Sequence, residues 1–167
     1  QIEKVVISRS HQIKVSKDFS VSSVLQILRN TYSNCTTFMF GIPNKGTFFG
    51  SSPEKLIHKK NIFIETDALA GTQARGKNLE EDRLLSETLI NSHKENSEHK
   101  LVVEQIKRKL NPLVKNLIFN KSPEIMKLAN VQHLKTPISA YLKKKDHILN
   151  LVKILHPTPA VAGTPTE

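Results

Sequence analysis

Two hydrophobic periodicities alternate along this chain, and their order constrains its fold more than any other feature of the sequence. Short stretches in which apolar residues alternate with polar ones, such as His11–Ser16, are typical of strands. Longer stretches in which apolar residues recur every three or four positions, such as Val21–Tyr32, are typical of amphipathic helices. Hairpin signals and long helices in one chain therefore predict an α+β fold, with mainly antiparallel β-sheets packed with helices.

The strand pattern predicts where the sheet forms. The turn signal Pro43–Gly46 separates two strand-like stretches and predicts a hairpin. A later strand, which contains Ile62 and Ile64, is expected to run into a turn at Gly71. The expected strands are Val5–Ile7, His11–Ser16, Phe38–Phe40, Thr47–Phe49, Ile62–Glu65, Leu128–Leu134 and Ser139–Leu142.

The helical pattern carries its own start signals. Ser20 can cap a helix that begins at Val21. Ser92 followed by Glu95 fits a capping box, which would divide a long helical region into two helices near Asn91. The expected helices begin at Val21 and at Ser52–Lys55, occupy Leu79–Ile118 as one or two segments, and run from Asp146 to Leu155.

The composition fits a single domain with an aliphatic core. Of the 167 residues, 38% are hydrophobic, but only seven are Phe and two are Tyr, and Trp is absent. The core is therefore expected to consist mainly of Ile, Leu and Val. The single cysteine, Cys35, excludes a disulfide within the chain. No apolar run approaches the roughly 18–20 residues that a helix needs to span a bilayer, so we expect no membrane insertion.

A net charge of +10 raises the question of a nucleic-acid partner, because basic surfaces attract phosphates. The basic residues, however, are spread in small clusters without the interleaved aromatic side chains that stack on bases. Solvated surfaces explain them, and we expect no nucleic-acid binding. A basic nucleic-acid-binding module is kept as the hypothesis from a different functional class. The clusters are Lys59–Lys60, Lys107–Lys109 and Lys143–Lys145.

Residues 68–76 and the helical region after them combine features that suit an anionic ligand held through a divalent metal. Gly71 permits close approach of the backbone to a ligand, and Thr72 adds a hydroxyl donor. Glu95 and Glu98 are three residues apart, so on a helix they share one face. Two carboxylates in that arrangement fit Mg²⁺, which takes one or two protein carboxylates and keeps several waters. A solvated acidic helix face is the structural alternative.

Lys4 and Glu54 are candidates for a base and an acid. Lys4 opens an apolar strand, where burial lowers a lysine pKa toward neutrality and allows it to act as a general base. The alternative is a lysine at the end of a strand that reaches into water. Glu54 lies at an expected helix start, where the helix dipole favours a carboxylate without any catalytic role. To act as an acid it needs a drier pocket or a nearby negative charge.

Six segments in this order resemble the motifs of the chorismate-binding enzyme family. That family includes isochorismate synthases, salicylate synthases and the chorismate-using subunits of anthranilate and aminodeoxychorismate synthases. The segments cover essentially the whole chain, which makes the resemblance specific. They are Lys4–Arg9, Phe49–Glu54, Ala68–Thr72, Ser92–His99, Val131–Leu134 and His156–Pro165.

Two positions resemble the isochorismate synthase branch of the family. Lys4 stands where isochorismate and salicylate synthases carry a water-activating lysine. Ala160 stands where isochorismate synthases have alanine and lyase-type members tend to have threonine. The resemblance therefore implies an isomerase that converts chorismate to isochorismate, with salicylate synthase as the alternative within the family.

The resemblance also assigns roles to the candidate residues. Lys4 would deprotonate a water that attacks C2 of chorismate, and Glu54 would protonate the departing C4 hydroxyl. His133 would lie along the ring near that hydroxyl, and Ala160 would line the substrate site.

The remaining implied roles concern the ring carboxylate. Glu98, with Glu95 beside it or acting through water, would hold Mg²⁺ against this carboxylate, and Gly71 and Thr72 would donate hydrogen bonds to it. Mg²⁺ is thus the expected cofactor, and it would screen and orient the carboxylate without generating the nucleophile.

Residues 1–167 are expected to be a partial chorismate-binding domain. The resemblance places further essential residues beyond the chain, among them a Tyr, an Arg, another metal-binding Glu and a late Lys, so we expect the 167 residues alone to be inactive. It implies a full-length enzyme that is monomeric and cytoplasmic, or plastidic in a photosynthetic eukaryote. Menaquinone, phylloquinone, siderophore and salicylate biosynthesis stay open as destinations of the product.

Overall fold

The computed structural model describes residues 4–163, which divide into two compact units. The smaller unit comprises Ser8–Glu54, and the larger one combines the chain up to Ile7 with the chain from Lys55 onward. Both units contain helices and antiparallel strands, which confirms the predicted α+β class. None of the helices within residues 4–163 has both the length and the apolar character that crossing a bilayer requires.

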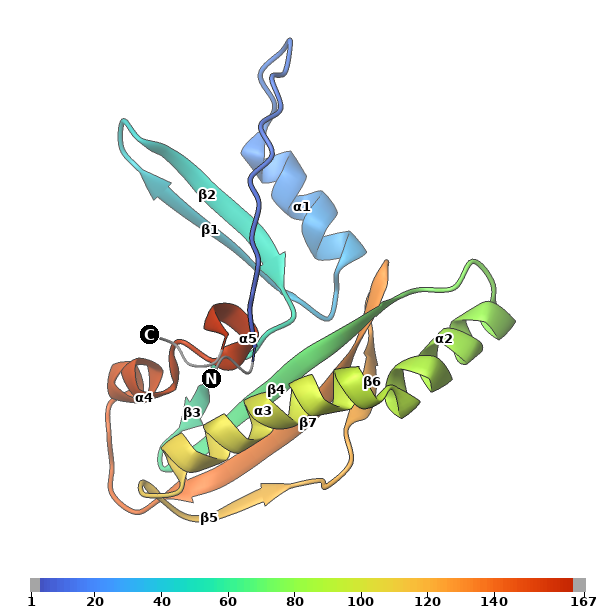
Figure 1. The fold of residues 1–167 in the computed structure, drawn as a ribbon. Coiled ribbons are helices and arrows are strands. Elements are labelled where there is room, and N and C mark those ends of the chain that lie inside the picture. Colours follow the sequence, from blue (N-terminus) through green and yellow to red (C-terminus); the bar gives the residue numbers. More distant parts are fainter. Residues whose placement is uncertain (1–3, 164–167) are drawn as a thin grey trace. The chain divides into compact units, whose positions relative to one another are not determined.

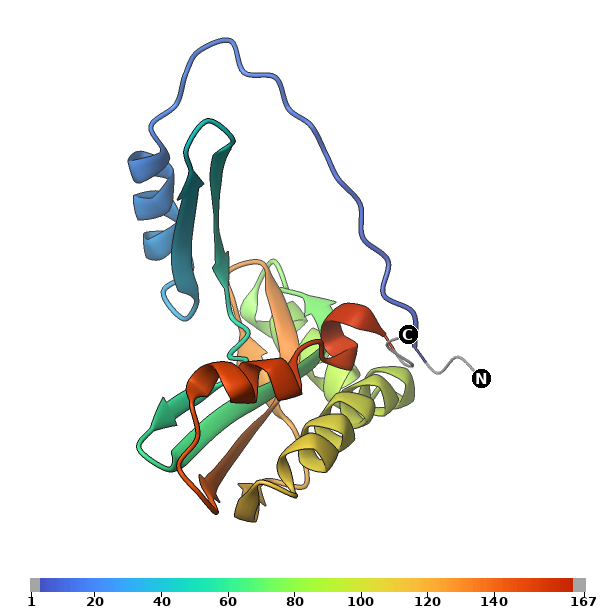
Figure 2. The ribbon, with the colours of Figure 1, turned by 90° about the vertical axis from the view of Figure 1, so that its left-hand side faces the viewer.

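The smaller unit consists of one helix packed on a hairpin (Figure 2). Helix α1 (Val21–Thr31) begins at Ser20, whose Oγ accepts a hydrogen bond from the Ser23 N–H at 3.3 Å. Strands β1 (Thr36–Ile42) and β2 (Gly46–Ser52) pair antiparallel in register around the predicted turn. The capped helix and the hairpin are thus confirmed.

Three predictions in and beside this unit are wrong. Residues 11–16 form no strand, since their alternating pattern has no partner strand to pair with. Residues 53–57 form no helix; after β2 the chain continues as an irregular segment toward the next strand. Val5–Ile7, in the larger unit, also lies outside any strand, with Ile7 89% exposed.

The larger unit is built on a five-stranded antiparallel sheet (Figure 1). The strand order is β3-β4-β7-β5, and β6 also pairs with β7. The two long central strands, β4 and β7, pair along almost their whole length. The strands are β3 (His58–Lys60), β4 (Phe63–Ala74), β5 (Val114–Phe119), β6 (Glu124–Lys127) and β7 (Val131–Leu142).

Helix α3 lies across the two central strands and covers one face of the sheet (Figure 1). Its apolar side packs into the core, together with residues of β4, β7 and α4, as the aliphatic composition predicts. The helices of this unit are α2 (Leu79–Asn91), α3 (His93–Leu110), α4 (Ile148–Leu155) and α5 (Pro159–Ala162). The buried core consists of Ile64, Ala68, Ala70, Val102, Val103, Ile106, Leu110, Val114, Ile138, Ala140, Leu142, Leu151 and Leu155.

The long helical region is divided where the capping box indicated. Ser92 ends α2 and caps α3, and its Oγ accepts a hydrogen bond from the Glu95 N–H at 3.3 Å. The prediction that helix continues to Ile118 is wrong, because α3 ends at Leu110 and β5 follows. Pro112 lies in the turn between them, where its missing N–H is tolerated.

A buried carboxylate joins the end of β4 to α2. Asp82 accepts hydrogen bonds from Arg75 Nε at 2.6 Å, from the Gly76 N–H at 3.0 Å and from Lys127 Nζ at 2.7 Å. The Arg75 guanidinium, then Lys127 and the Gly76 N–H, hold the pKa of this carboxyl well below its usual range. The cluster thereby connects α2 to β4 and to β6.

We expect Asp82→Asn to weaken the acid sensitivity of the protein. Because the folded pKa of Asp82 lies below the unfolded value of about 3.9, its contribution is complete above that value and is lost as the pH falls below it. The variant should be less stable at neutral pH, and its loss of stability on acidification should be smaller than in the wild type. Urea unfolding of the full-length protein across this pH range measures both effects.

Glu80→Gln is the matched control for that experiment, because the Glu80 side chain is 69% exposed on the same helix. Its stability should follow the wild-type pH profile. An Asp82→Asn profile parallel to that of the wild type would exclude Asp82 as the source of the acid sensitivity.

We also expect Gly76→Ala to destabilise the protein by about 1–3 kcal/mol, as overpacking of a closed site does. A Cβ at position 76 would lie 2.1 Å from the backbone nitrogen of Asp82, and backbone atoms cannot move aside independently. Gly41→Ala is the control, since its new Cβ would meet nothing closer than 4.0 Å. Thermal unfolding compares the two variants, and equal effects would contradict the packing argument.

Candidate functional site

The site is organised around a bulge in β4. The register between β4 and β7 shifts between Ala70 and Thr72, and Gly71 adopts a φ of 81°. Only glycine adopts this conformation without strain, and a Cβ there would lie 3.1 Å from the Leu134 Cδ1 atom. The expected turn at Gly71 is therefore a bulge inside one continuous strand.

The bulge directs Thr72 toward two other elements. Its backbone N–H donates a hydrogen bond to the Oε2 atom of Glu95 on α3, at 3.2 Å. Its Oγ1 atom lies 3.0 Å from the Nδ1 atom of His133 on β7. Burial lowers the pKa of His133, against the opposing effect of a hydrogen bond with the Gly71 backbone, so the ring is neutral at neutral pH.

Glu98 lies on the same helix and pairs with the predicted base. Its Oε1 atom is 2.8 Å from Lys4 Nζ, and the Lys4 side chain is only 8% exposed. A pocket of about 380 Å³ lies beside this ion pair. The Lys4 side chain therefore does not reach into water, as the alternative expected. The pocket is lined by Lys4, Val5, His93, Lys94, Ser97, Glu98 and Leu101.

Ala160 lies in the short helix α5, half-buried, and packs against the core of the larger unit. Gly163 ends this helix with a φ of 79°, and a Cβ there would lie 2.6 Å from the Lys4 carbonyl oxygen. The C-terminal end of α5 therefore adjoins the backbone of Lys4. Thr164 and Pro165, which complete the predicted motif, lie outside the described residues.

Glu54 belongs to the smaller unit, and it does not begin a helix. It follows β2 in an irregular segment, and its backbone N–H donates a hydrogen bond to the Ser52 Oγ at 3.2 Å. A helix dipole therefore does not explain its presence. The structure thus connects Lys4 to Glu98, and Thr72 to Glu95 and His133, within the larger unit, while Glu54 is described in the smaller one.

Glu95 and Glu98, two of the three carboxylates on α3, are the residues that could hold a metal. Within residues 4–163 no three His, Cys, Asp or Glu side chains gather as a metal cluster. Mg²⁺ commonly uses only one or two protein carboxylates, with water and substrate oxygens completing its shell. Glu95 and Glu98 lie one turn apart, and their side chains keep exposures of 18% and 31%. This donor set suits Mg²⁺ bound together with an anionic substrate.

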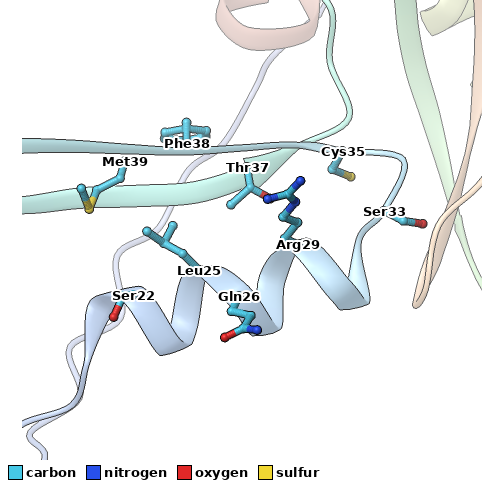
Figure 3. Close-up of a pocket in the computed structure, with 9 residues that line it drawn as sticks. All are labelled: Ser22, Leu25, Gln26, Arg29, Ser33, Cys35, Thr37, Phe38 and Met39. Carbon is cyan, nitrogen blue, oxygen red and sulfur yellow. The ribbon is translucent and has the colours of Figure 1, made fainter.

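The smaller unit has a pocket of its own, of about 660 Å³, between α1 and β1 (Figure 3). Arg29 extends from α1 toward Thr37 and Cys35, and Leu25 faces Met39 across the pocket (Figure 3). None of the predicted site residues lines it. The predicted site residues therefore lie elsewhere in the chain.

His99 is not among the site residues predicted from the sequence. This side chain is only 3% exposed, and both of its ring nitrogens lie within hydrogen-bond distance of oxygen atoms. The signal that could have identified it is its spacing, since it follows Glu95 by four residues and therefore shares its helix face.

Comparison with known proteins connects this geometry to a family. Residues 1–167 match the family described as chorismate binding enzyme. The salicylate biosynthesis isochorismate synthase of Pseudomonas aeruginosa is 41% identical over 162 residues, which are 97% of this chain and 34% of that protein. Isochorismate synthase MenF of Bacillus subtilis is 34% identical over 168 residues, which cover 100% of this chain and 35% of that protein.

The same relationship is visible in three dimensions. The menaquinone-specific isochorismate synthase MenF from Escherichia coli has a solved structure that superposes with a TM-score of 0.80 at 32% identity, over 87% of this chain and 33% of that chain. The chain thus spans about a third of the length of the relatives that it matches. With its whole length matched in sequence and most of it in structure, the chain belongs to the chorismate binding enzyme family.

Proposed function

We propose that this chain contributes the base, the acid and part of the metal site of an isochorismate synthase. The observation that carries the proposal is the ion pair between the buried Lys4 side chain and Glu98. Glu98 lies on α3, the helix that also binds the Gly71 bulge through Glu95. The substrate is chorismate, and the product is the isomer in which a hydroxyl at C2 replaces the hydroxyl at C4. The three relatives named above are isochorismate synthases, which supports this choice.

In the proposed reaction, Lys4 takes a proton from a water molecule whose oxygen attacks C2. The ring double bonds shift, the bond between C4 and its oxygen breaks, and Glu54 protonates the departing hydroxyl. One water is consumed and one is released, so the reaction is an isomerisation. The Nδ1 atom of His133 is held by the Thr72 hydroxyl, which fixes the orientation of the neutral ring beside the substrate.

Glu98 and Glu95 would hold Mg²⁺, which would screen the ring carboxylate of the substrate and orient it. Glu98 Oε1 also lies 2.8 Å from Lys4 Nζ, so one carboxylate adjoins both the proposed base and the proposed metal site.

The bulge supports the binding side of the proposal. Gly71 fits the narrow space beside Leu134 and Glu95, where a Cβ would lie 3.1 Å from Leu134 Cδ1, and the hydroxyl of the neighbouring Thr72 is a candidate donor to a ligand carboxylate. Both residues adjoin Glu95, which places hydrogen-bond donors and a metal-binding carboxylate on one short segment of the site.

We expect Lys4→Ala to lower kcat for chorismate by at least about 100-fold in the full-length protein with Mg²⁺, which is the usual contribution of a general base. Lys144→Ala is the control, because Lys144 is an exposed lysine outside the site and should leave kcat unchanged. Initial rates of isochorismate formation measure both variants. A Lys4→Ala variant with wild-type kcat would disprove the assignment of the base.

We also expect the full-length protein to form isochorismate without releasing pyruvate. A small alanine at position 160 is the feature that resembles isochorismate synthases, whereas a salicylate synthase eliminates the pyruvyl group. A lactate dehydrogenase-coupled assay for pyruvate, run beside chromatography of the ring products, distinguishes the two enzymes. Salicylate and pyruvate in equal amounts would support the alternative.

A further inference from the structure

His99 connects three elements from a buried position on α3. Its Nδ1 atom lies 3.2 Å from the carbonyl oxygen of Ala70 on β4, and its Nε2 atom lies 2.8 Å from the hydroxyl of Thr136 on β7. A carbonyl oxygen can only accept, so Nδ1 carries the proton and donates it to Ala70. In the neutral ring, Nε2 is then the acceptor for the Thr136 hydroxyl. The two bonds together fit one tautomer of that ring.

The carbonyl that His99 binds lies immediately before the bulge. Glu95 accepts the N–H of Thr72, immediately after the bulge, so α3 binds β4 on both sides of Gly71. Glu95 and His99 are four residues apart, which places them one above the other on one helix face. These two bonds fix both the shape of the bulge and the rotation of α3 about its axis.

The rotation of α3 determines where the Glu98 carboxylate points. Glu98 directly precedes His99 and contacts Lys4. Among the described residues, this is the only ion pair between α3 and Lys4. Thr136, the second partner of His99, is in register with Ala68 inside the sheet, away from Thr72 and His133. The link from His99 to Thr136 therefore anchors the helix to the sheet without occupying the space of a substrate.

We propose that His99 is a positioning residue, which holds α3 and the Gly71 bulge so that Glu98, Glu95 and Thr72 face the substrate carboxylate. It would touch neither substrate nor metal. The kinetic consequences of this inference rest on the proposed isochorismate synthase activity. Its structural consequence does not: loss of the His99 hydrogen bonds should change the environment of the Thr72 amide whether or not the protein has that activity.

The competing explanation is that His99 only fills space in the core. Val102 and Ile106 continue the same face of α3 into the core. The experiment must therefore separate the effect of the volume of the His99 side chain from the effect of its hydrogen bonds. His99→Phe keeps an aromatic ring and removes both bonds. His99→Gln keeps an amide that can donate and accept. Thr136→Val removes the second bond from the opposite side while it preserves the shape of the side chain.

Thr66→Val is the matched control. Thr66 is a buried threonine on β4 of the same sheet, 2% exposed, and its hydroxyl donates to the Leu56 carbonyl at 2.7 Å, outside the proposed site. Its loss should destabilise the fold to an extent similar to that of Thr136→Val. Thr66→Val and Thr136→Val should therefore differ only in their effects on the kinetic constants and on the Thr72 amide.

The experiment uses the full-length protein, with chorismate and Mg²⁺ varied independently. His99→Phe should lower kcat/KM by about 10–100-fold and raise the Mg²⁺ concentration for half-maximal rate, as loss of a residue that supports metal ligands does. Thr136→Val should show a smaller change of the same kind, His99→Gln should recover part of the loss, and Thr66→Val should keep wild-type kinetics. If His99→Phe fails to fold, Thr136→Val and His99→Gln carry the test.

The NMR chemical shift of the Thr72 amide proton provides the second readout. The shift should change in His99→Phe and Thr136→Val, but not in Thr66→Val. Kinetic constants and a Mg²⁺ requirement within twofold of wild type, together with an unchanged Thr72 shift, would overturn the proposal and leave His99 as a core residue. If the wild-type protein makes no isochorismate, the proposed function fails, and the Thr72 shift alone decides the role of His99.

Discussion

The packing of α3 onto the two central strands is the interaction on which the rest of the larger unit depends. Val102, Ile106 and Leu110 turn toward the sheet and are almost completely buried. Burial of a side chain of this size contributes roughly 1.5–3 kcal/mol, so this helix face is a large part of the driving force for folding. The sheet in turn presents Ile138 and Ala140 of β7 to the same core.

The same helix changes character along its length. Its C-terminal half is apolar on the buried side, whereas its N-terminal half presents Glu95 and His99 to the strand that bears the bulge. A polar group facing a regular strand would find the backbone already paired within the sheet. The bulge at Gly71 releases an N–H and a C=O from that pairing, and these are the groups that the two side chains bind. Packing of the apolar C-terminal half of α3 thus places Glu95 and His99, in its N-terminal half, beside the bulge.

Local signals in the sequence were sufficient to predict those features that depend only on neighbouring residues. The cap at Ser20, the hairpin around Pro43–Gly46 and the division of the long helical region at Ser92 are confirmed, because caps and turns depend on a few neighbouring residues. The strands expected at residues 5–7 and 11–16 are absent, because a strand also needs a partner, which periodicity does not reveal. The helix expected to reach residue 118 ends at 110 for a related reason, since pairing with β7 selects a strand after Pro112.

In the candidate site, too, local features could be predicted from the sequence, whereas contacts between distant residues could not. The spacing of Glu95 and Glu98 on one helix face was readable from the sequence, whereas the turn expected at Gly71 is a bulge within a strand. The contact between Lys4 and Glu98 joins residues 94 positions apart, and the contact between His99 and Thr136 joins two different elements. Such pairs depend on how the chain folds back on itself, which no local pattern encodes.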